Sequence, residues 1–290
     1  MRSWWKIMLG IALSCIGIGI VFGMIGIAIG RNRAISTRNN TFSFSDTVAG
    51  VESIDIDVKF SKVEIISGNE FSVVVNNMME DGFKSYVKDG VWYLKDDYDD
   101  DNFINLFGFE IPITQGWFSW NFELGDYAPL IQITMPDEFI AKEYNISLGA
   151  GELDMKVLNA NNCDLLVGAG SIKLQRLNIT NKAKLEVAAG ELVVSNLKTL
   201  DANITCGMGS ARITGEIQRN LTADCGMGSI EMDLSGEEDN YDYYISCGVG
   251  NVKLNSHNYN FIADDKIQNQ NAVGTFKLTC GMGSIDVKIK

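Results

Sequence analysis

The pentapeptide "CGMGS" occupies residues 206–210 and returns unchanged at 225–229 and 280–284. It belongs to a series of seven related octapeptides: "LGAGELDM" from Leu148, "VGAGSIKL" from Val167, "VAAGELVV" from Val187, "CGMGSARI" from Cys206, "CGMGSIEM" from Cys225, "CGVGNVKL" from Cys247 and "CGMGSIDV" from Cys280. Successive copies start 19, 20, 19, 19, 22 and 33 residues apart. A period of about 20 residues, held over four intervals, is typical of a solenoid in which each coil stacks on the one before it.

Apolar residues alternate with other residues on both sides of the glycines. Two places before the seven copies stand Ile146, Leu165, Leu185, Ile204, Ala223, Ile245 and Leu278. After the glycines the apolar positions resume one place out of phase, at pairs such as Leu153 and Met155. Period two predicts strands with one buried face, and the change of phase predicts a bend between two strands of each coil.

The two glycine positions of the repeat differ in what they accept. The first holds Ala188 in one copy, whereas the second is glycine in all seven: Gly151, Gly170, Gly190, Gly209, Gly228, Gly250 and Gly283. We therefore expect a positive φ angle at the second glycine, since only glycine adopts it freely. The residue that follows is Glu, Ser or Asn, which is typical of an exposed corner.

Four cysteines share one position of the repeat, namely Cys206, Cys225, Cys247 and Cys280. Other copies place Leu148, Val167 or Val187 there, so the position calls for a buried apolar group of modest size. Stacked coils lie about 4.8 Å apart, so four such thiols would extend over roughly 14 Å, too far for one tetrahedral zinc. The sequence favours inert core thiols over metal or disulfide chemistry, and no cofactor is expected.

Residues upstream of the repeats show weaker strand patterns. The stretch "IDIDVKFSKVEI" at 54–65 matches the repeat in phase without its glycines, which predicts a degenerate first coil at the end of the stack. Asp89 and Gly90 predict a hairpin turn, and 131–135 predicts a strand that Pro136 ends. We therefore expect an all-β, single-stack parallel β-solenoid over 48–290. Its part 48–140 is an irregular first coil, hairpin and cap, and 141–290 holds regular coils of about 19–20 residues.

The first 40 residues have a different composition. Residues 7–30 contain no charged side chain, and about 20 apolar residues suffice for a helix to cross a bilayer. The segment predicts an uncleaved membrane helix within an anchor and linker at 1–40, with a cleaved signal peptide as the alternative. Basic residues stand on both sides of the span, so charge alone does not decide its orientation. Two glycine pairs, Gly19 with Gly23 and Gly26 with Gly30, could support a homodimer through this helix.

The charge balance of the remaining 250 residues is acidic. All 37 acidic side chains lie there, against 19 of the 24 basic ones. Such a body repels phosphate backbones, which makes nucleic acid an unsuitable partner.

Candidate chemical groups are sparse. His257 is the single histidine, and no Ser or Cys motif accompanies it that would make it a catalytic base. Asp97, Asp99 and Asp101 could bind calcium, although a solvated acidic loop is favoured because the EF-hand glycine and glutamate positions are not matched. Trp117, Phe118 and Trp120 lie in an aromatic stretch without strand periodicity. We expect this cluster to cover a solenoid end, with a partner site or a bilayer contact as alternatives.

Several segments together resemble a known family. An N-terminal membrane helix, "IDIDVKFSKVEI", "DGVWYLKDD", "PLIQITMPDEFI" and serial "GxGxIxV" coils are similar to DUF4097, a bacterial family of adhesin-like β-solenoids. The resemblance covers about residues 48–290. It implies a single-pass protein of the cell membrane whose C-terminal domain lies outside the cytoplasm, and the family includes proteins encoded near envelope-stress systems. It carries over no catalytic residue.

The sequence therefore predicts a protein that binds and does not catalyse. Its expected partner is a protein or a cell-envelope glycan, in adhesion or in scaffolding and sensing of envelope stress. One alternative is a polysaccharide-active β-helix enzyme, which would gather carboxylates in one groove. Another is a polymerising scaffold similar to bactofilins, which would leave its solenoid ends uncovered.

Overall fold

The computed structural model describes residues 42–59, 61–78, 82–96, 103–106, 109–112, 129–260 and 262–290. The strands are β1 (Phe42–Val48), β2 (Ser53–Val58), β3 (Lys62–Gly68), β4 (Phe71–Met78), β5 (Phe83–Lys88), β6 (Val91–Asp96), β7 (Phe103–Leu106), β8 (Phe109–Pro112), β9 (Leu130–Pro136), β10 (Ala141–Leu148), β11 (Glu152–Val167), β12 (Ser171–Val187), β13 (Glu191–Cys206), β14 (Ser210–Cys225), β15 (Ser229–Leu234), β16 (Tyr241–Cys247), β17 (Asn251–Leu254), β18 (His257–Asn260), β19 (Ala263–Ile267), β20 (Gly274–Cys280) and β21 (Ser284–Ile289). A 3-10 turn, η2 (Glu238–Asn240), precedes β16. The predicted all-β class is confirmed.

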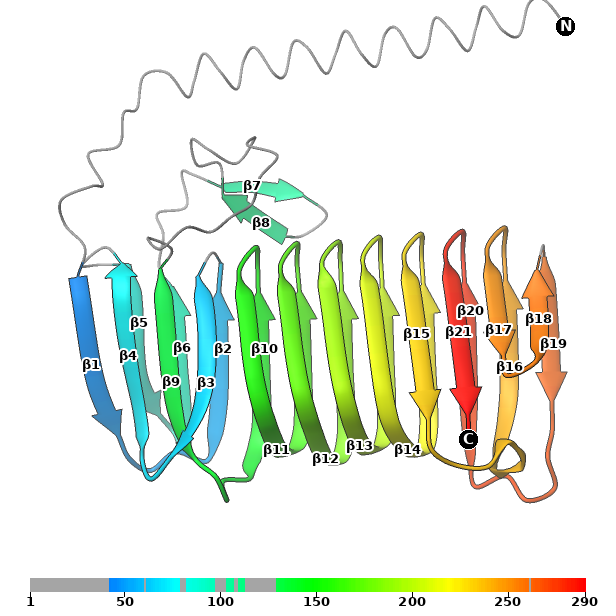
Figure 1. Ribbon diagram of the computed structural model, residues 1–290, viewed down its shortest axis with the longest axis horizontal. Helices are drawn as coiled ribbons and strands as arrows, with labels where there is room; N and C mark the ends of the chain where they lie inside the picture. Colours follow the sequence, from blue (N-terminus) through cyan, green and yellow to red (C-terminus); the bar gives the residue numbers. More distant parts are fainter. Residues whose placement is uncertain are drawn as a thin grey trace, which may run out of the picture. The chain divides into compact units, whose positions relative to one another are not determined.

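Apart from the β7–β8 hairpin, the strands form two ladders that face each other (Figure 1). The first ladder runs β5, β6, β2, β10, β11, β12, β13, β14, β20, β16, β19. The second runs β1, β4, β9, β3, β11, β12, β13, β14, β15, β21, β17, β18. The long strands β11–β14 bend, so their first halves lie in the second ladder and their last halves in the first.

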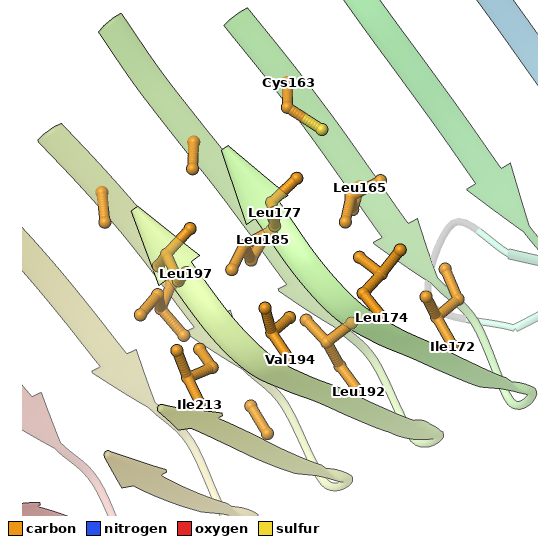
Figure 2. Packing of buried hydrophobic residues seen from close by; sticks show 14 of the residues in the cluster. Cys163, Leu165, Ile172, Leu174, Leu177, Leu185, Leu192, Val194, Leu197 and Ile213 are labelled. Carbon is orange, nitrogen blue, oxygen red and sulfur yellow. The ribbon is translucent and has the colours of Figure 1, made fainter. Parts of the chain in front are cut away.

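The core fills the space between the ladders. Figure 2 shows Leu165 and Leu185 of the first ladder and Leu174 and Val194 of the second, all of them buried. Parallel pairing keeps equivalent residues in columns, as where Leu165 lies opposite Leu185. Each fully buried aliphatic side chain of this kind contributes about 1.5–3 kcal/mol. The two phases of apolar alternation in the sequence thus give one continuous core.

The glycine motifs form three-residue turns that join the ladders along one edge of the stack (Figure 1). We call this the turn edge; it comprises Lys59 and Ser61 together with residues 149–151, 168–170, 188–190, 207–209, 226–228, 248–250 and 281–283. Adjacent turns bond to each other through the backbone. The Met227 N–H donates to the carbonyl of Gly207 at 2.7 Å, and the Met282 N–H to that of Gly226 at 2.8 Å. The turns therefore keep the spacing of the strands.

The expectation of positive φ at the second glycine is wrong. The described residues with positive φ include none of the seven second glycines. The reason for glycine is close stacking instead: a Cβ at Gly209 would overlap the carbonyl oxygen of Gly190 and would lie 2.8 Å from Cγ1 of Val187. At the first position the fit is looser, since a Cβ at Gly207 would lie 2.8 Å from the nearest atom, the carbonyl oxygen of Ala188.

The last two coils are interchanged relative to the chain. The sequence predicts that each coil stacks on the one before it, but β20 pairs with β14 on one side and β16 on the other. On the second ladder β21 likewise lies between β15 and β17. The final coil of the chain is therefore inserted between two earlier ones, and Figure 1 shows β20 and β21 in that place.

The stretch 54–65 forms a coil but does not end the stack. Ile54, Ile56 and Val63 are buried, and β2 and β3 align in register with β10 and β11. However, β6 and β9 pair with β2 and β3 on their outer side. Beyond these two strands come the antiparallel partners β5, β4 and β1, so the expected terminal position of this coil is wrong.

The N-terminal strands confirm the predicted hairpin. Asp89 and Gly90 join β5 to β6 with φ angles of 53° and 77°. Antiparallel strands also close the other end, where β18 pairs with β17 and β19 with β16.

The predicted membrane helix at 7–30 lies outside the described residues. Within the described part of the chain, no helix has the length and apolar character needed to span a bilayer.

Candidate binding surfaces

The outward side chains of the first ladder form a column across its strands. Parallel and antiparallel registers bring together, in spatial order, Tyr86, Tyr93, Asp55, Asn145, Asp164, Lys184, Asn203, Thr222, Lys277, Tyr244 and Lys266. We call this set the tyrosine-flanked column. Apart from its tyrosines it offers carboxylates, amides, a hydroxyl and amines, which are hydrogen-bonding groups of both kinds. Because each belongs to a paired strand, their spacing is fixed by the backbone.

The N-terminal end of the column is an aromatic platform. The rings of Tyr86 and Tyr93 stack with centroids 5.1 Å apart and planes inclined by 21°. The Lys95 ammonium lies 5.6 Å from the centroid of Tyr93. It also lies 3.8 Å from a carboxylate oxygen of Asp55 and 3.8 Å from one of Asp57. This end of the column presents an exposed aromatic face bordered by charged groups.

A buried tryptophan anchors the strands that carry the platform. Trp92 is fully buried next to Tyr93 in the chain, and its Nε1–H donates to the Ser85 hydroxyl at 3.0 Å. Burial raises the pKa of Asp55, with Lys95 opposing the rise and Asp57 adding to it. The strands that carry the platform are therefore anchored in the core, and charged groups border the platform on its surface.

Charges in the middle of the column are paired. Lys184 Nζ lies 3.0 Å from Asp164 and 3.0 Å from Glu186. Hydrogen bonds to Asp164 and then to Glu186 raise the pKa of Lys184, which keeps it protonated. At the far end the Lys266 ammonium lies 5.1 Å from the ring centroid of Tyr244. Both ends of the column thus combine a tyrosine with a lysine.

The second ladder presents a different outer surface. Its column runs Asp154, Lys173, Val193, Arg212, Glu231, Asp286 and Lys253 in spatial order. Arg212 pairs with Glu231 at 3.0 Å, and Lys253 with Asp286 at 3.5 Å. Inserting the last coil places Glu231 beside Asp286, whereas sequence order would place it beside Lys253. Opposite charges pair within this column rather than converging on a ligand site.

The repeat cysteines are buried in one column of the core. Cys206, Cys225, Cys280 and Cys247 are neighbours in that order, and all are free thiols. The hydrogen bond with Cys206, together with burial, raises the pKa of Cys225. Burial chiefly raises the pKa of Cys247 and Cys280. Among the residues that the structure describes, no cluster of His, Cys, Asp or Glu could hold a metal ion.

Several predicted site residues cannot be placed. Asp97, Asp99 and Asp101, and likewise Trp117, Phe118 and Trp120, lie outside the described residues. His257 is described; it is exposed at the start of β18, opposite Leu254.

Sequence reasoning missed the tyrosine platform, although a signal for it exists. A two-residue turn at Asp89–Gly90 fixes the hairpin register, which pairs Tyr86 with Tyr93. The contact of Tyr244 with Lys266 has no such local signal, because β16 and β19 are separated by two other strands of the chain.

Comparison with known proteins identifies a family. The sequence pattern of the Toastrack family, DUF4097, matches residues 51–267. The fold is similar to a candidate cell adhesion protein of Clostridium sporogenes, at 18% identity and a TM-score of 0.34, covering 87% of this chain and 100% of the other. It is also similar to a candidate adhesin of Bacteroides fragilis, at 14% identity, a TM-score of 0.44, and coverage of 89% and 100%. No curated protein sequence matches the chain.

A third similar structure is named for a different role. A candidate lipid-binding protein of Parabacteroides distasonis is similar at 12% identity and a TM-score of 0.45, covering 87% of this chain and 98% of the other.

Proposed function

The chain belongs to the Toastrack family, DUF4097, and from this premise we propose that it is a membrane-anchored binding protein of the cell envelope that catalyses no reaction. Its partner is a cell-envelope glycan, and its binding surface is the tyrosine-flanked column of the first ladder. The anchor is the apolar segment 7–30, and the described body lies outside the cytoplasm. Adhesion and the sensing of envelope stress are both uses to which such binding can be put.

The observation that carries this proposal is the exposed tyrosine stack at one end of a polar column. The ring of Tyr86, which is 45% exposed on the outermost strand and is backed by the stacked ring of Tyr93, can cover the apolar face of a sugar ring. Asp55 and Asn145, next along the column, offer oxygen acceptors to sugar hydroxyls, and the Asn145 amide also offers donors. Strand pairing holds all four groups in place before binding, which limits the entropy lost on association.

Two features favour binding over the alternatives. In the middle of the column, Asp164 and Glu186 each contact Lys184, whereas hydrolysis of a polysaccharide needs two carboxyl groups that flank one bond. At the ends of the ladders, antiparallel strands such as β1 and β18 cover the parallel coils. Such covers oppose the coil-on-coil stacking by which an open solenoid would polymerise.

Sedimentation with insoluble glycan tests the proposal. The full chain, reconstituted in lipid nanodiscs, is mixed with purified Gram-positive peptidoglycan carrying its wall polymers. We expect the chain to sediment with it, and the double variant Tyr86→Ser/Tyr93→Ser to bind at least about tenfold more weakly, since buried aromatic contacts dominate such interfaces.

The matched control changes the other face of the stack. The variant Arg212→Ser/Glu231→Ser removes an exposed pair of the second ladder and should bind as the parent does. Equal loss in both variants, or no sedimentation of the parent chain, would refute the column as a glycan site. Circular dichroism of each variant checks that the β-structure is intact.

A further inference from the structure

A row of exposed apolar side chains runs along the turn edge of the C-terminal coils. The middle residues of four adjacent turns are Met208, Met227, Met282 and Val249, in that spatial order. Their exposed fractions are 49%, 55%, 64% and 66%. Ile262, between β18 and β19, continues the row with 90% of its surface exposed. We call these five residues the methionine ridge.

The ridge is held in place by the backbone beneath it. The three methionines donate their N–H groups to the neighbouring turns, and the Ile262 N–H donates to the carbonyl of Gly248 at 2.8 Å in the same manner. In the turn of Val249, the Gly250 N–H donates to the carbonyl of Gly281 at 2.9 Å. Strands of a ladder lie about 4.8 Å apart, so five successive members extend over about 19 Å. The ridge is therefore a preformed apolar line, with mobile thioether side chains on a fixed base.

The four turns of the ridge are uncharged, and acidic residues follow only at its Ile262 end, at Asp264 and Asp265. The pentapeptides 206–210, 225–229 and 280–284 and the segment 247–251 contain no Asp, Glu, Lys or Arg, in a chain with 37 acidic residues. In the coils nearer the N-terminus the middle residue is the small Ala150, Ala169 or Ala189. A contiguous exposed apolar surface of this kind indicates a contact surface.

The remaining exposed apolar side chains lie elsewhere: Ile66 and Val157 border one small cavity beside β3 and β11, and Tyr244 belongs to the first ladder. Tyr86 belongs to the platform of the first ladder, and Ile140 and Val273 stand alone in connections between strands. Single exposed apolar residues are ordinary on protein surfaces, so they point to no partner.

The chain reaches this body at the same edge. Phe42, the first described residue, pairs with Met78 at the end of β4, and Asn76 of β4 lies opposite Leu130. Leu130 pairs with Lys62, which directly follows the first turn of the turn edge. The predicted membrane span ends at residue 30, so residues 31–41 connect it to the turn edge. Eleven residues reach at most about 36 Å, which brings the bilayer surface within range of this edge.

We propose that the methionine ridge lies against the bilayer in which the chain is anchored, with its methionine side chains in the boundary between headgroups and acyl chains. This inference rests on the proposed anchoring by residues 7–30. Thioether side chains on uncharged turns enter that boundary without taking a charge of those turns out of water, while the acidic body stays in solvent. The turn edge then faces the membrane, and the tyrosine-flanked column stands beside it, open to the envelope.

Nitroxide accessibility in vesicles tests the inference. The full chain carrying Met227→Cys is labelled with a nitroxide and reconstituted in vesicles of phosphatidylcholine and phosphatidylglycerol. The control is Val273→Cys, whose parent residue is 64% exposed and precedes β20 at the opposite edge, where Val273 N–H bonds to the carbonyl of Asn240. The described native cysteines are buried, and the unsubstituted chain serves as the blank for labelling.

We expect the label at position 227 to collide with oxygen rather than with a water-soluble nickel complex. Its oxygen-to-nickel ratio should exceed that at position 273 by at least about threefold, as for a side chain in the interfacial region. In the variant that also carries Met208→Gln and Met282→Gln, the ratio at position 227 should fall toward the control.

Three results would overturn the inference. Equal ratios at the two positions, in a chain that stays in the vesicles after alkaline washing, would show that anchoring holds and the ridge does not touch lipid. Release of the chain by the wash would remove the anchor and the inference together. Spin–spin broadening at position 227 that grows with protein density would assign the ridge to a second copy of the chain.

Discussion

The central coils, β10 to β15, and the C-terminal coils, β16 to β21, carry the same glycine motif but differ in how they stack. In the centre, each coil pairs with its predecessor in the chain. At the C-terminal end the coil of β20 and β21 lies inside the earlier coil of β16 and β17. The motif therefore defines which residues share a column, whereas it leaves open which coil becomes the neighbour.

The antiparallel strands explain the interchange. β19 pairs with β16, and β18 pairs with β17. The coil of β16 and β17 therefore has an antiparallel strand beside it in each ladder. The coil of β20 and β21 has parallel partners on both sides and no antiparallel strand of its own. If it stood outermost, two edge strands would be open to pairing with other chains. With the covered coil last, the outermost strands are instead the short β18 and β19, of 4 and 5 residues, and short edge strands limit such pairing.

The largest effect that we predict tests the close stacking of the central coils. Gly209→Val should lower the free energy of unfolding by more than about 3 kcal/mol, because the added atoms overlap the carbonyl of Gly190 and Cγ1 of Val187. Gly209→Ala should cost less than that, and Gly207→Ala least, since the first position already accepts Ala188. Urea midpoints of the three variants give the order.

The same change at the end of the stack sharpens the comparison. A Cβ at Gly250 would overlap the carbonyl of Gly283, but its own coil has only the antiparallel cover on the other side. We expect Gly250→Ala to cost less than Gly209→Ala because the outer coil can shift outward. Equal midpoints for Gly209→Ala and Gly207→Ala would contradict the account of the turns.

The second prediction tests whether the C-terminal coils stack out of sequence order. The pair Met227→Cys/Met282→Cys lies on adjacent coils about 4.8 Å apart and should form a disulfide on oxidation. Met227→Cys/Val249→Cys lies two coils apart, at about 9.6 Å, and should not. The first disulfide should raise the free energy of unfolding by about 2–3 kcal/mol. Cross-linking of the second pair in preference to the first would mean that the coils stack in sequence order.

The third prediction compares thiols by pH. Burial raises the pKa of Cys163 in the central coils above its ordinary value of 9.0. The unfolded thiol ionises near pH 9 while the folded one stays neutral, so its contribution is fully present below pH 9 and is lost as pH rises above it. One such group costs up to about 1.4 kcal/mol per pH unit. Urea midpoints at pH 8 and 10 should fall less for Cys163→Ala than for the parent. Cys247→Ala, at the end of the stack, should change this difference less, and an identical pH dependence of the parent and Cys163→Ala would contradict the prediction.

The sequence patterns predict which residues of this fold share a column, but they do not give the reason for each glycine. Alternation and period give the columns, as at Leu165 and Leu185, because burial depends on residues within one coil. The invariance of Gly209 shows that a Cβ is not tolerated, but close approach and positive φ leave the same mark on a sequence. Only the position of Gly190 in space separates the two causes.

Ser61 is a second example of a feature that the sequence of one coil cannot explain. It stands at the second glycine position of its coil, fully buried, and its hydroxyl donates to Asp96 at 3.2 Å. The coil outside it has no three-residue turn in its sequence, since its strands β6 and β9 are separated in the chain by residues 97–129. A side chain is accepted where the outer neighbour is not a glycine turn, which no single repeat can reveal. The tyrosine platform needed only the hairpin register, whereas the stacking order and the methionine ridge required the assembled coils.

The smallest predicted effect concerns the thiol column, where the two regions meet. The Sγ of Cys225 would lie 2.8 Å from a Cβ at Gly283, and Cγ1 of Val187 lies equally close to one at Gly209. Cysteine and valine thus place one atom against the next glycine turn in the same way, and valine adds one methyl group. We expect Cys225→Val to fold and to cost about 1 kcal/mol through imperfect repacking.

Cys247→Val at the end of the stack is the matched variant. It should lower the free energy of unfolding by less, because its coil can shift outward toward the antiparallel strand β19. Urea midpoints measure both, and zinc analysis of the purified protein accompanies them. Stoichiometric zinc in the parent chain that disappears in Cys225→Val would contradict the packing role of the thiols. A larger loss of unfolding free energy for Cys247→Val than for Cys225→Val would show that the interchanged end of the stack is packed as tightly as its centre. The two regions would then not differ in how readily their coils adjust to an added methyl group.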